Sequence, residues 1–448
     1  MWRFAWRFLA AVSLVSLARP AAAESRPRYG GTLAVELHDT VTLTDPADWP
    51  LRMLPLVYDR LVRLDPEGRP QPALAVSWQH DASNRHWEFH LRPHAIFHNG
   101  FPLTAPTVAA CLKDWLNVTA LGDNVVVFQS DTSAPDLPVR LAGARGAIFM
   151  RGADGATAGT GPFRVAEWQP GKRALLAAFD GYWGGRPFVD SLEIRMGRTY
   201  REQAIDLELG KADLVEIPIT DLRRAAQQSV RTWTAAPSEL LALLFEPGPG
   251  PAGDAHLREA IALSIDRDAI HTVLLQSQGE STGAILPEWL TGYAFLFPAS
   301  RALDRARQIA AALPKNALRV SLAYDPADPL ERPIAERIAL NAREAGISIQ
   351  TAAGVSGALR LERFPLRSLD PAEALAEMGR RLHIDALPVP VTPEARVQYE
   401  HKLLGDYRLV PLFDLPAIYG LSSRVKNWDP QPWGDWRLDN VWLETRTP

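Results

Sequence analysis

Apolar and polar residues alternate along several short stretches of the chain, which predicts β-strands with one buried face. In 33–37, Leu, Val and Leu alternate with Ala and Glu. In 87–91, Trp, Phe and Leu alternate with Glu and His. A period of two is that of a half-buried strand. Further strands are expected within 164–180 on both sides of a Gln-Pro-Gly turn, at 240–245 and at 318–324.

Other stretches have the spacing of an amphipathic helix. Thr104 can cap a helix that begins near Ala105, with Pro106 at an early position where its missing N–H costs little. Helix and strand alternate in the second half, which favours an α/β unit. The chain shows no internal repeat, and the composition changes near 236–253. The other expected helices are 51–63, 200–209, 255–264, 268–276, 302–313 and 333–345.

Length and composition indicate a folded protein of more than one structural unit. The chain has 448 residues, of which 47% are apolar and 22% charged, so a disordered protein is excluded. It carries 48 basic and 52 acidic side chains, a formal net charge of −4. Such a balance argues against a nucleic-acid binder that works through bulk charge. We therefore expect no nucleic-acid partner.

The N-terminal segment reads as a cleaved export signal. Arg3 and Arg7 precede the apolar stretch 8–18, and the small residues 21–23 offer a cut before Glu24. Eleven apolar residues are too few to span a bilayer, which needs about 20. Removal of 1–23 takes away three arginines and no acid, so the net charge becomes −7. We expect a periplasmic protein, freely soluble outside the inner membrane.

The cysteine content fits that location without an anchor. Cys111 is the only cysteine of the chain, and it lies far from the expected cleavage point. It therefore cannot serve as a lipid-attachment site there, and an intrachain disulfide is excluded.

Four histidines follow one another at a spacing of four residues, which on a helix would suit a metal site. They are His86, His90, His94 and His98. The segment alternates as a strand, however, with Trp87 and Phe89 on its buried side. His86 and His90 then point to solvent, and we expect no metal ligands.

Two further motifs resemble catalytic or cofactor loops but lie in the wrong context. Residues 279–283 match G-x-S-x-G, yet an expected helix comes before them instead of a strand. Residues 248–253 match G-x-G-x-x-G, yet Pro249 and Pro251 remove two N–H groups that a pyrophosphate would need. We therefore expect neither an enzyme nor a bound cofactor.

A series of short segments, in order and nearly over the whole mature chain, resembles the family 5 substrate-binding proteins of ABC transporters, the extracytoplasmic receptors of peptide and nickel importers. Each segment alone is weak, and their order and spacing carry the resemblance. The segments are 29–33 (YGGTL), 44–46 (TDP), 56–62 (LVYDRLV), 72–78 (PALAVSW), 87–92 (WEFHLR), 97–104 (FHNGFPLT), 159–163 (GTGPF), 167–171 (EWQPG), 182–187 (YWGGRP) and 257–267 (LREAIALSIDR).

This resemblance implies a two-lobe α/β fold of the Venus-flytrap type, close to type II or cluster C binding proteins. Lobe I would comprise 24–238 and 417–448, with a subdomain near 46–158, and lobe II would comprise 239–416. A peptide or similar small solute would lie in the cleft between them. Closure would create the form that the ABC permease complex recognises, and we expect a monomer.

The resemblance also implies which residues hold the solute. The edge that pairs with an extended peptide would be 39–42, with Thr40, Val41 and Thr42. Family members that bind peptides have an aromatic residue, an amine-binding Asp three residues later, and then an acid–Pro pair. Without a gap, Phe364 takes the aromatic position, Asp370 begins the acid–Pro pair, and Arg367 falls where the amine-binding Asp should be.

Arg367 would therefore reverse the charge at the amine-binding position. An ammonium group beside a desolvated guanidinium would lose a favourable pair and meet repulsion. We hypothesise that the protein prefers an anionic or uncharged solute over a free peptide N-terminus. Two alternatives stay open: Arg367 pairs with Glu362 or points to solvent, or a three-residue gap moves Asp370 into the amine-binding position.

Two other functional classes compete with the importer receptor. A ligand sensor or chaperone-like binding protein would use the same lobes without transport. An extracytoplasmic hydrolase is less well supported, because the chain has no nucleophile–base pair in a suitable context. The chain is also shorter than is typical of the family between 378 and 392. Two interpretations stay open: a smaller or more open cleft, or a member that has lost transport function.

Overall fold

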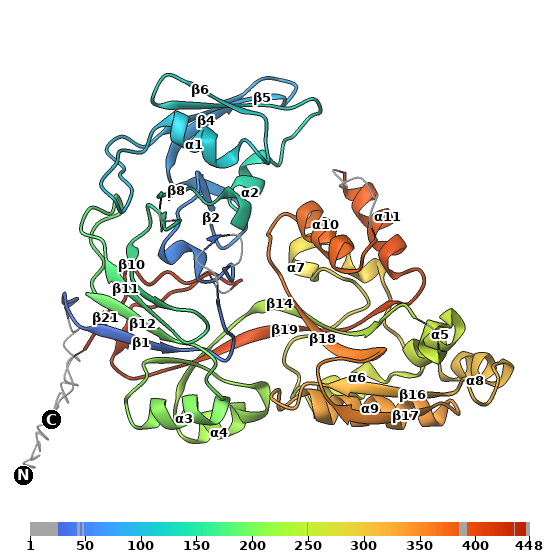
Figure 1. Ribbon diagram of the computed structural model, residues 1–448. Coiled ribbons are helices and arrows are strands. Elements are labelled where there is room, and N and C mark those ends of the chain that lie inside the picture. The colour runs from blue at the N-terminus through green and yellow to red at the C-terminus, as the bar shows by residue number, and fades with distance from the viewer. Residues whose placement is uncertain are drawn as a thin grey trace, which may run out of the picture.

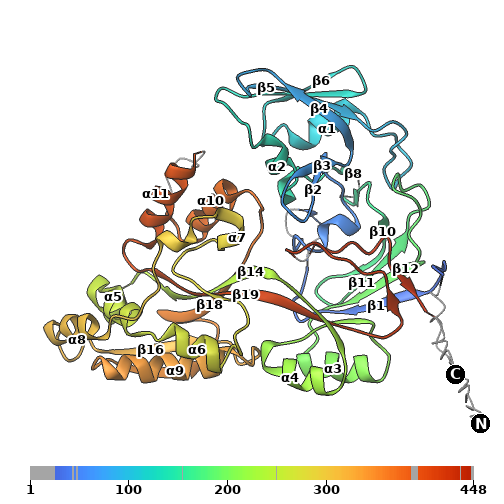
Figure 2. The same ribbon diagram turned by 180° about the vertical axis from the view of Figure 1, so that it is seen from behind.

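Two halves joined by long strands make up the molecule, as Figure 1 and the reverse view in Figure 2 show. We call residues 26–238 with 417–444 lobe I and residues 239–416 lobe II, following the predicted division. The expected export segment lies outside the described residues. The computed structural model describes residues 26–42, 45–46, 49–153, 155–248, 250–384, 392–433 and 435–444.

One 11-stranded sheet runs through both lobes. Its centre is the antiparallel pair β14 (Arg231–Phe245) and β19 (Leu409–Leu421), and both strands pass from one lobe into the other. On the lobe I side β1 is parallel to β12 and β13. On the lobe II side β16 is parallel to β17 and β18. The strand order is β10-β11-β12-β1-β13-β19-β14-β18-β16-β17, with β15 paired to β19.

Lobe I carries a separate four-stranded sheet, in the order β4-β5-β7-β6, at the top of Figure 1. Besides its parts of β14 and β19, lobe I contains, in chain order, β1 (Thr32–Glu36), β2 (Val62–Leu64), β3 (Pro70–Pro72), β4 (Ala75–His80), β5 (His86–Leu91), α1 (Ala105–Leu112), β6 (Val118–Leu121), β7 (Val125–Gln129), α2 (Leu137–Leu141), β8 (Met150–Arg151), β9 (Thr157–Ala158), β10 (Phe163–Gln169), β11 (Arg173–Ala178), β12 (Ser191–Arg195), α3 (Tyr200–Glu208), β13 (Leu214–Glu216), α4 (Leu222–Gln227), β20 (Val425–Lys426) and β21 (Trp442–Leu443).

Lobe II places helices on both faces of its part of the large sheet (Figures 1 and 2). Its elements are α5 (Ala255–Ser264), α6 (Arg267–Val273), β15 (Glu280–Ser281), α7 (Glu288–Thr291), α8 (Leu303–Ala312), β16 (Arg319–Tyr324), α9 (Glu331–Glu344), β17 (Ser348–Ala353), β18 (Leu359–Pro365), α10 (Pro371–Arg381) and α11 (Pro393–Leu404).

The lobe II half of β14 is buried on both faces. Leu241 and Leu243 belong to the core that contains α5 and α9, whereas Leu240 and Leu244 belong to the core that contains α10 and α11. A strand covered on both faces needs apolar residues at every position. This explains why 240–245 is a continuous apolar run in the sequence.

Most of the expected elements are confirmed, and one helix is wrong. The expected helix at 51–63 is only a 3-10 turn at Leu54–Leu56, and β2 begins at Val62. Pro55 lies within this segment, and a proline lacks the N–H that an α-helix needs in its interior. On β5, Trp87 and Phe89 are buried as predicted.

In the part of the chain that the structure describes, no helix has the length and apolar run needed to cross a membrane.

Candidate functional site

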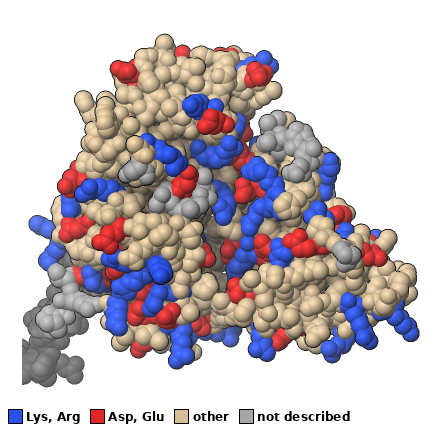
Figure 3. Space-filling model, in the orientation of Figure 1, with Lys and Arg blue, Asp and Glu red and all other residues tan. Residues whose placement is uncertain are grey.

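Two neighbouring cavities lie between the lobes. Cavity 1 has a volume of about 850 Å³ and cavity 2 of about 660 Å³. Figure 3 shows the hollow between the halves, with basic and acidic side chains gathered along it. Residues of both lobes line each cavity. Five residues line both cavities and form the wall between them: Ser238, Glu239, Pro365, Leu366 and Arg367.

The lobe I wall of cavity 1 is organised around Arg52. Its Nη2 donates to Asp39 Oδ2 and to Glu216 Oε1, both at 3.1 Å. Glu216 Oε2 also accepts the His38 backbone N–H at 2.6 Å. Burial raises the pKa of Glu216, and the Arg52 guanidinium opposes that rise. One arginine thus holds two carboxylates at fixed positions on this wall.

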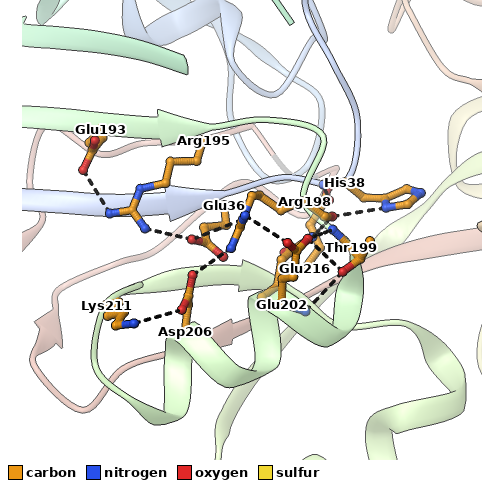
Figure 4. A network of polar contacts seen from close by, with 11 residues as sticks. Glu36, His38, Glu193, Arg195, Arg198, Thr199, Glu202, Asp206, Lys211 and Glu216 are labelled. Carbon is orange, nitrogen blue, oxygen red and sulfur yellow. Dashed lines mark hydrogen bonds and ion pairs between the residues drawn. The ribbon is translucent and has the colours of Figure 1, made fainter. Parts of the chain in front are cut away.

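A polar network behind this wall holds His38 in place (Figure 4). Arg195 Nη1 donates to Glu36 Oε1 at 2.9 Å, and Arg198 Nη2 donates to Asp206 Oδ2 at 3.0 Å. Burial raises the pKa of Glu36, and the Asp206 carboxylate raises it further. His38 Nδ1 lies 3.3 Å from the Arg198 carbonyl oxygen. The network therefore ties β1, β12 and α3 to the rim of cavity 1.

The lobe II wall of cavity 1 repeats the arrangement of one arginine between two carboxylates. Arg363 pairs with Asp328 Oδ2 at 2.6 Å through Nη2, and with Glu239 through Nη1. Nearby, Glu331 accepts the Asp325 backbone N–H at 2.7 Å. Burial raises the pKa of Glu331 to about 7. Both walls are thus built from paired charges with an acid in excess.

The lining of cavity 1 carries more acids than bases. Such an excess favours an uncharged or cationic group over an anion inside the cavity. Its acids are Asp39, Glu216, Glu239, Asp325, Asp328, Glu331 and Glu362, and its bases are Arg52, Arg360, Arg363 and Arg367.

Direct contacts between the lobes lie beside the two cavities. The Trp289 ring of lobe II lies parallel to the Trp433 ring of lobe I, with 6.4 Å between centroids and 15° between planes. An apolar cluster that includes Ala142 and Leu369 also joins the two lobes. Three ion pairs cross the same interface: Arg140–Asp370 (3.5 Å), Arg145–Glu373 (3.8 Å) and Asp136–Arg396 (3.5 Å).

The predicted peptide-pairing edge lies at cavity 1 only in part. Thr40 and Val41 line the cavity, whereas Thr42 lies outside the lining of both cavities. The Val41 N–H is directed at Met196 Sδ at 3.4 Å, and the Val41 carbonyl accepts the Gly171 N–H at 2.9 Å. The main-chain groups of Val41 are therefore already used within lobe I.

Phe364 and Asp370 line cavity 2 and are both buried. The Arg381 guanidinium lies over the Phe364 ring, 4.7 Å from its centroid. Asp370 caps α10 by accepting the Ala372 N–H at 3.0 Å, and it also pairs with Arg140. Burial raises the pKa of Asp370. The side chain thus has a structural role at the helix start.

Arg367 lies in the wall between the two cavities and is exposed. Glu362, one of its expected partners, pairs instead with Arg360 at 2.6 Å and with Arg381 at 3.7 Å. Among the described residues, none forms an ion pair or a side-chain hydrogen bond with Arg367. The guanidinium is therefore free to meet a group inside the cleft.

Sequence reasoning missed the paired charges that build cavity 1. Arg52 and Glu216 are more than 160 residues apart in the chain, and so are Asp39 and Glu216. Arg363 and Glu239 come together only because β14 pairs with β18. No local pattern marks such pairs, because each residue alone reads as an ordinary surface charge.

The chain matches a known family model over most of its length. Residues 69–364 match the model described as "Bacterial extracellular solute-binding proteins, family 5 Middle". The probable D,D-dipeptide-binding periplasmic protein DdpA of Escherichia coli K12 is 26% identical over 271 residues, 53% of this chain and 52% of that protein. The nickel-binding periplasmic protein of the same strain is 23% identical, covering 66% of this chain and 65% of that protein. The match to DdpA therefore spans about half of that relative's length.

Solved structures share the fold. The murein tripeptide-binding protein MppA of Escherichia coli superimposes with a TM-score of 0.77 at 15% identity, covering 93% of this chain and 99% of that one. NikA of Staphylococcus aureus, in complex with Ni(L-His)₂, has a TM-score of 0.74 at 17% identity, covering 92% and 100%. These similarities confirm the two-lobe α/β fold.

Proposed function

The chain belongs to the bacterial extracellular solute-binding proteins of family 5, and we propose that it is the solute-binding receptor of an ABC importer. The observation that carries this proposal is cavity 1, an 850 Å³ space walled by both lobes and backed by the strands β14 and β19. A cleft of that size suits a small solute such as a short peptide. The peptide class is a proposal that two relatives' names support.

We propose that the residues lining the cleft bind the solute and do not change it chemically. Each arginine holds two carboxylates in place, so hydrogen-bonding groups are positioned before the solute arrives. Closure of the lobes excludes water and strengthens these contacts. We infer no chemical step, and the solute leaves unchanged. The closed form would then meet the permease complex in the periplasm as a monomer.

Arg367 supports a more specific proposal about the charge of the solute. An unpaired guanidinium in the wall between the cavities disfavours an ammonium group next to it. We propose that the part of the solute beside Arg367 is uncharged or anionic. Thr40, Val41, Phe364 and Asp370 would contribute shape more than charge pairing, and the placement of Thr42 makes it the weakest of the predicted residues.

Binding and closure can be measured together. Native mass spectrometry of the purified protein and a thermal-shift screen of peptides and metabolites identify solutes. Small-angle scattering with a bound solute should then show a smaller radius of gyration than without it. Arg363→Ala should lower affinity at least about tenfold, because it leaves Glu239 and Asp328 unpaired.

The matched control is Arg332→Ala, which removes an exposed pair with Glu336 on the surface of α9. It should leave solute affinity unchanged. The receptor proposal fails if no solute shifts the melting temperature, or if turnover of a bound solute is detected.

A further inference from the structure

The floor of cavity 2 is a row of three residues on adjacent strands of the large sheet. Asp414 of β19 lies opposite Leu240 of β14, and Leu240 lies opposite Phe364 of β18. Directly opposed residues share one face of a sheet, and adjacent strands lie about 5 Å apart. All three residues line cavity 2. An acid therefore lies about 10 Å from the Phe364 position across this floor.

Asp414 is a buried carboxyl group without a counter-ion. Its exposed fraction is only 2%. Within the described part of the chain its carboxylate forms no ion pair, and the Thr282 hydroxyl is the polar neighbour that favours its ionised form. An isolated buried carboxylate is costly, and native proteins rarely keep one without a partner. This acid lines a cavity, so the partner can come from outside the chain.

The surroundings of Asp414 are acidic or apolar. Desolvation by burial raises the pKa of Asp414 well above its ordinary value; the Glu280 and Glu400 carboxylates raise it further, while the Thr282 hydroxyl lowers it. Glu400 accepts the backbone N–H groups of Ile285 and Leu286, which form the apolar wall of cavity 2. In the described residues, none of the three acids has a lysine or arginine partner.

The arginines that line cavity 2 do not supply that partner. Only Arg367 remains without a carboxylate, and it lies in the wall toward cavity 1. The other four are each paired, as Arg140–Asp370, Arg145–Glu373, Arg380–Glu377 and Arg381–Glu362. Their charges are thus offset, and none of these arginines is paired with Asp414.

We propose that cavity 2 is a specificity pocket for a cationic group of the solute, an ammonium or a guanidinium, and that Asp414 is its counter-ion. The apolar stem that carries the cation would lie on Leu240 and Leu286. This inference rests on the proposed receptor function and narrows its solute class. It also separates two positions in the cleft, since the cation goes to Asp414 and stays away from Arg367.

A proton should leave when the cation binds. Desolvation by burial raises the pKa of the Asp414 carboxyl, and the Glu280 and Glu400 carboxylates raise it further, so the protonated form is favoured in the free protein. An entering ammonium favours the ionised carboxylate, so the carboxyl proton is released to solvent. The solute keeps its own charge, and the overall charge balances. Titration calorimetry in two buffers of different ionisation enthalpy measures this release.

The test compares probes that differ only in charge. One pair is N-acetyl-Ala-Lys-Ala and N-acetyl-Ala-norleucine-Ala, and a smaller pair is hexylamine and hexanol. In the native protein we expect the amine of at least one pair to bind at least about tenfold more tightly than its neutral partner. We expect release of about one proton per amine and none for the neutral probe.

Asp414→Asn keeps the size of the side chain and removes its charge. It should abolish both the preference and the proton release without lowering the melting temperature, because a desolvated acid is replaced by a neutral amide. Glu336→Gln is the matched control, since Glu336 is an exposed acid that pairs with Arg332 on α9 and lies outside the lining of both cavities. It should retain the preference.

The outcomes separate the two proposals. Equal affinity for amine and neutral probes in the native protein, or a preference that persists in Asp414→Asn, overturns the cationic pocket and leaves the receptor function standing. If the screen finds solutes and neither probe pair binds, the pocket is likewise overturned. If no solute binds at all, the receptor function fails, and the pocket fails with it. The calorimetry uses the native protein, so the comparison of amine and neutral probes remains a valid test even if the variant misfolds.

Discussion

At the scale of single residues, the arginines that line the cleft follow one rule with one exception. They are held by carboxylates, as in Arg52 with Asp39 and Glu216. Arg367 is the exception among the arginines, and Asp414 is a buried acid that has no ion pair in the described part of the chain. Paired charges build a wall, whereas an unpaired charge is available to a solute.

Replacing Arg367 tests its effect on the solute. Arg367→Asp should create a preference for a free-amine tripeptide over its N-acetylated form, because an acid at this position can pair with the ammonium group. We expect the ratio of the two dissociation constants to change by about tenfold or more relative to the native protein. Fluorescence or calorimetric titration of both peptides provides the measurement.

The control for that experiment is Arg319→Asp, a charge reversal at an exposed position on β16 away from the cleft. It should leave the ratio unchanged. A native protein that clearly prefers the free amine would contradict the proposed role of Arg367.

Glu400 predicts a pH dependence of stability. Desolvation by burial raises its pKa to about 7, while the N–H groups of Ile285 and Leu286 lower it. The folded state therefore binds a proton that the unfolded chain releases above its own pKa of about 4.5. This contribution is fully present below that lower pKa and is lost as pH rises toward 7.

The loss attributable to Glu400 can amount to about 3 kcal/mol at most. Glu400→Gln should remove it, so the free energy of unfolding of the variant should fall less between pH 4.5 and 7.5 than that of the native protein. Urea unfolding at several pH values measures both slopes. Parallel slopes would show that Glu400 is ionised in the folded protein.

At the scale of elements, helix starts differ in ways that residue type alone does not show. Thr199 caps α3 in a reciprocal capping box: its hydroxyl accepts the Glu202 N–H at 3.3 Å, and the Glu202 carboxylate accepts the Thr199 N–H at 2.9 Å. Thr104 stands at the same position before α1 but makes no capping bond, and its hydroxyl meets Thr107 instead. The predicted position of Thr104 at the N-cap is therefore confirmed, but its side chain does not make the capping hydrogen bond.

These two threonines form a matched pair for mutagenesis. Thr199→Ala should lower the free energy of unfolding by about 1 kcal/mol, because it leaves the Glu202 N–H without its acceptor. Thr104→Ala should lower the free energy of unfolding by clearly less than Thr199→Ala does. Chemical denaturation of both variants measures the difference, and equal losses would contradict the structural distinction between the two caps.

The two crossing strands, β14 and β19, contain a pair of opposed prolines near the predicted division between the lobes. Pro237 of β14 lies opposite Pro416 of β19, and the register shifts on both sides of Pro237. A proline has no N–H to donate, so the ladder lacks hydrogen bonds at this pair. We therefore expect the two strands to bend most easily at this pair, at the predicted division between the lobes.

At the scale of the whole molecule, ion pairs and stacked aromatic rings join the two lobes beside the cavities, and we call this contact the seam. The Arg140–Asp370 pair and the Trp289–Trp433 stack both cross it. The Arg145–Glu373 pair also crosses it and is partly exposed; such exposed pairs contribute on the order of 0.2–1 kcal/mol each, and salt weakens them. Small changes should therefore shift the equilibrium between the open and closed arrangements of the lobes.

Arg140→Ala should open the seam. We expect a larger radius of gyration of the solute-free protein in scattering, and raised salt should move the native protein in the same direction. The control is Arg224→Ala, whose pair with Asp221 lies within lobe I at the start of α4. A radius that Arg140→Ala and salt both leave unchanged would show that the seam does not hold the lobes together.

The sequence by itself determined the family, the order of elements and much of the core. Alternating residues such as Trp87 and Phe89 predict a buried strand face because a strand turns successive side chains to opposite sides. The apolar run at 240–245 predicts a strand, and order and spacing of short segments indicate two lobes. These features are local, so neighbours in the chain suffice to read them. The helix expected at 51–63 failed where Pro55 interrupts the hydrogen bonding.

Only the tertiary structure decided which charges meet. Glu216 reaches Arg52 and Glu239 reaches Arg363 through strand pairing between distant segments. The same folding buries Asp414, which reads in the sequence as an ordinary surface residue, and leaves Arg367 exposed in the wall between the cavities. A charge acquires its role from the partner and the burial that the fold provides, and neither of these is a property of the residue's position along the chain.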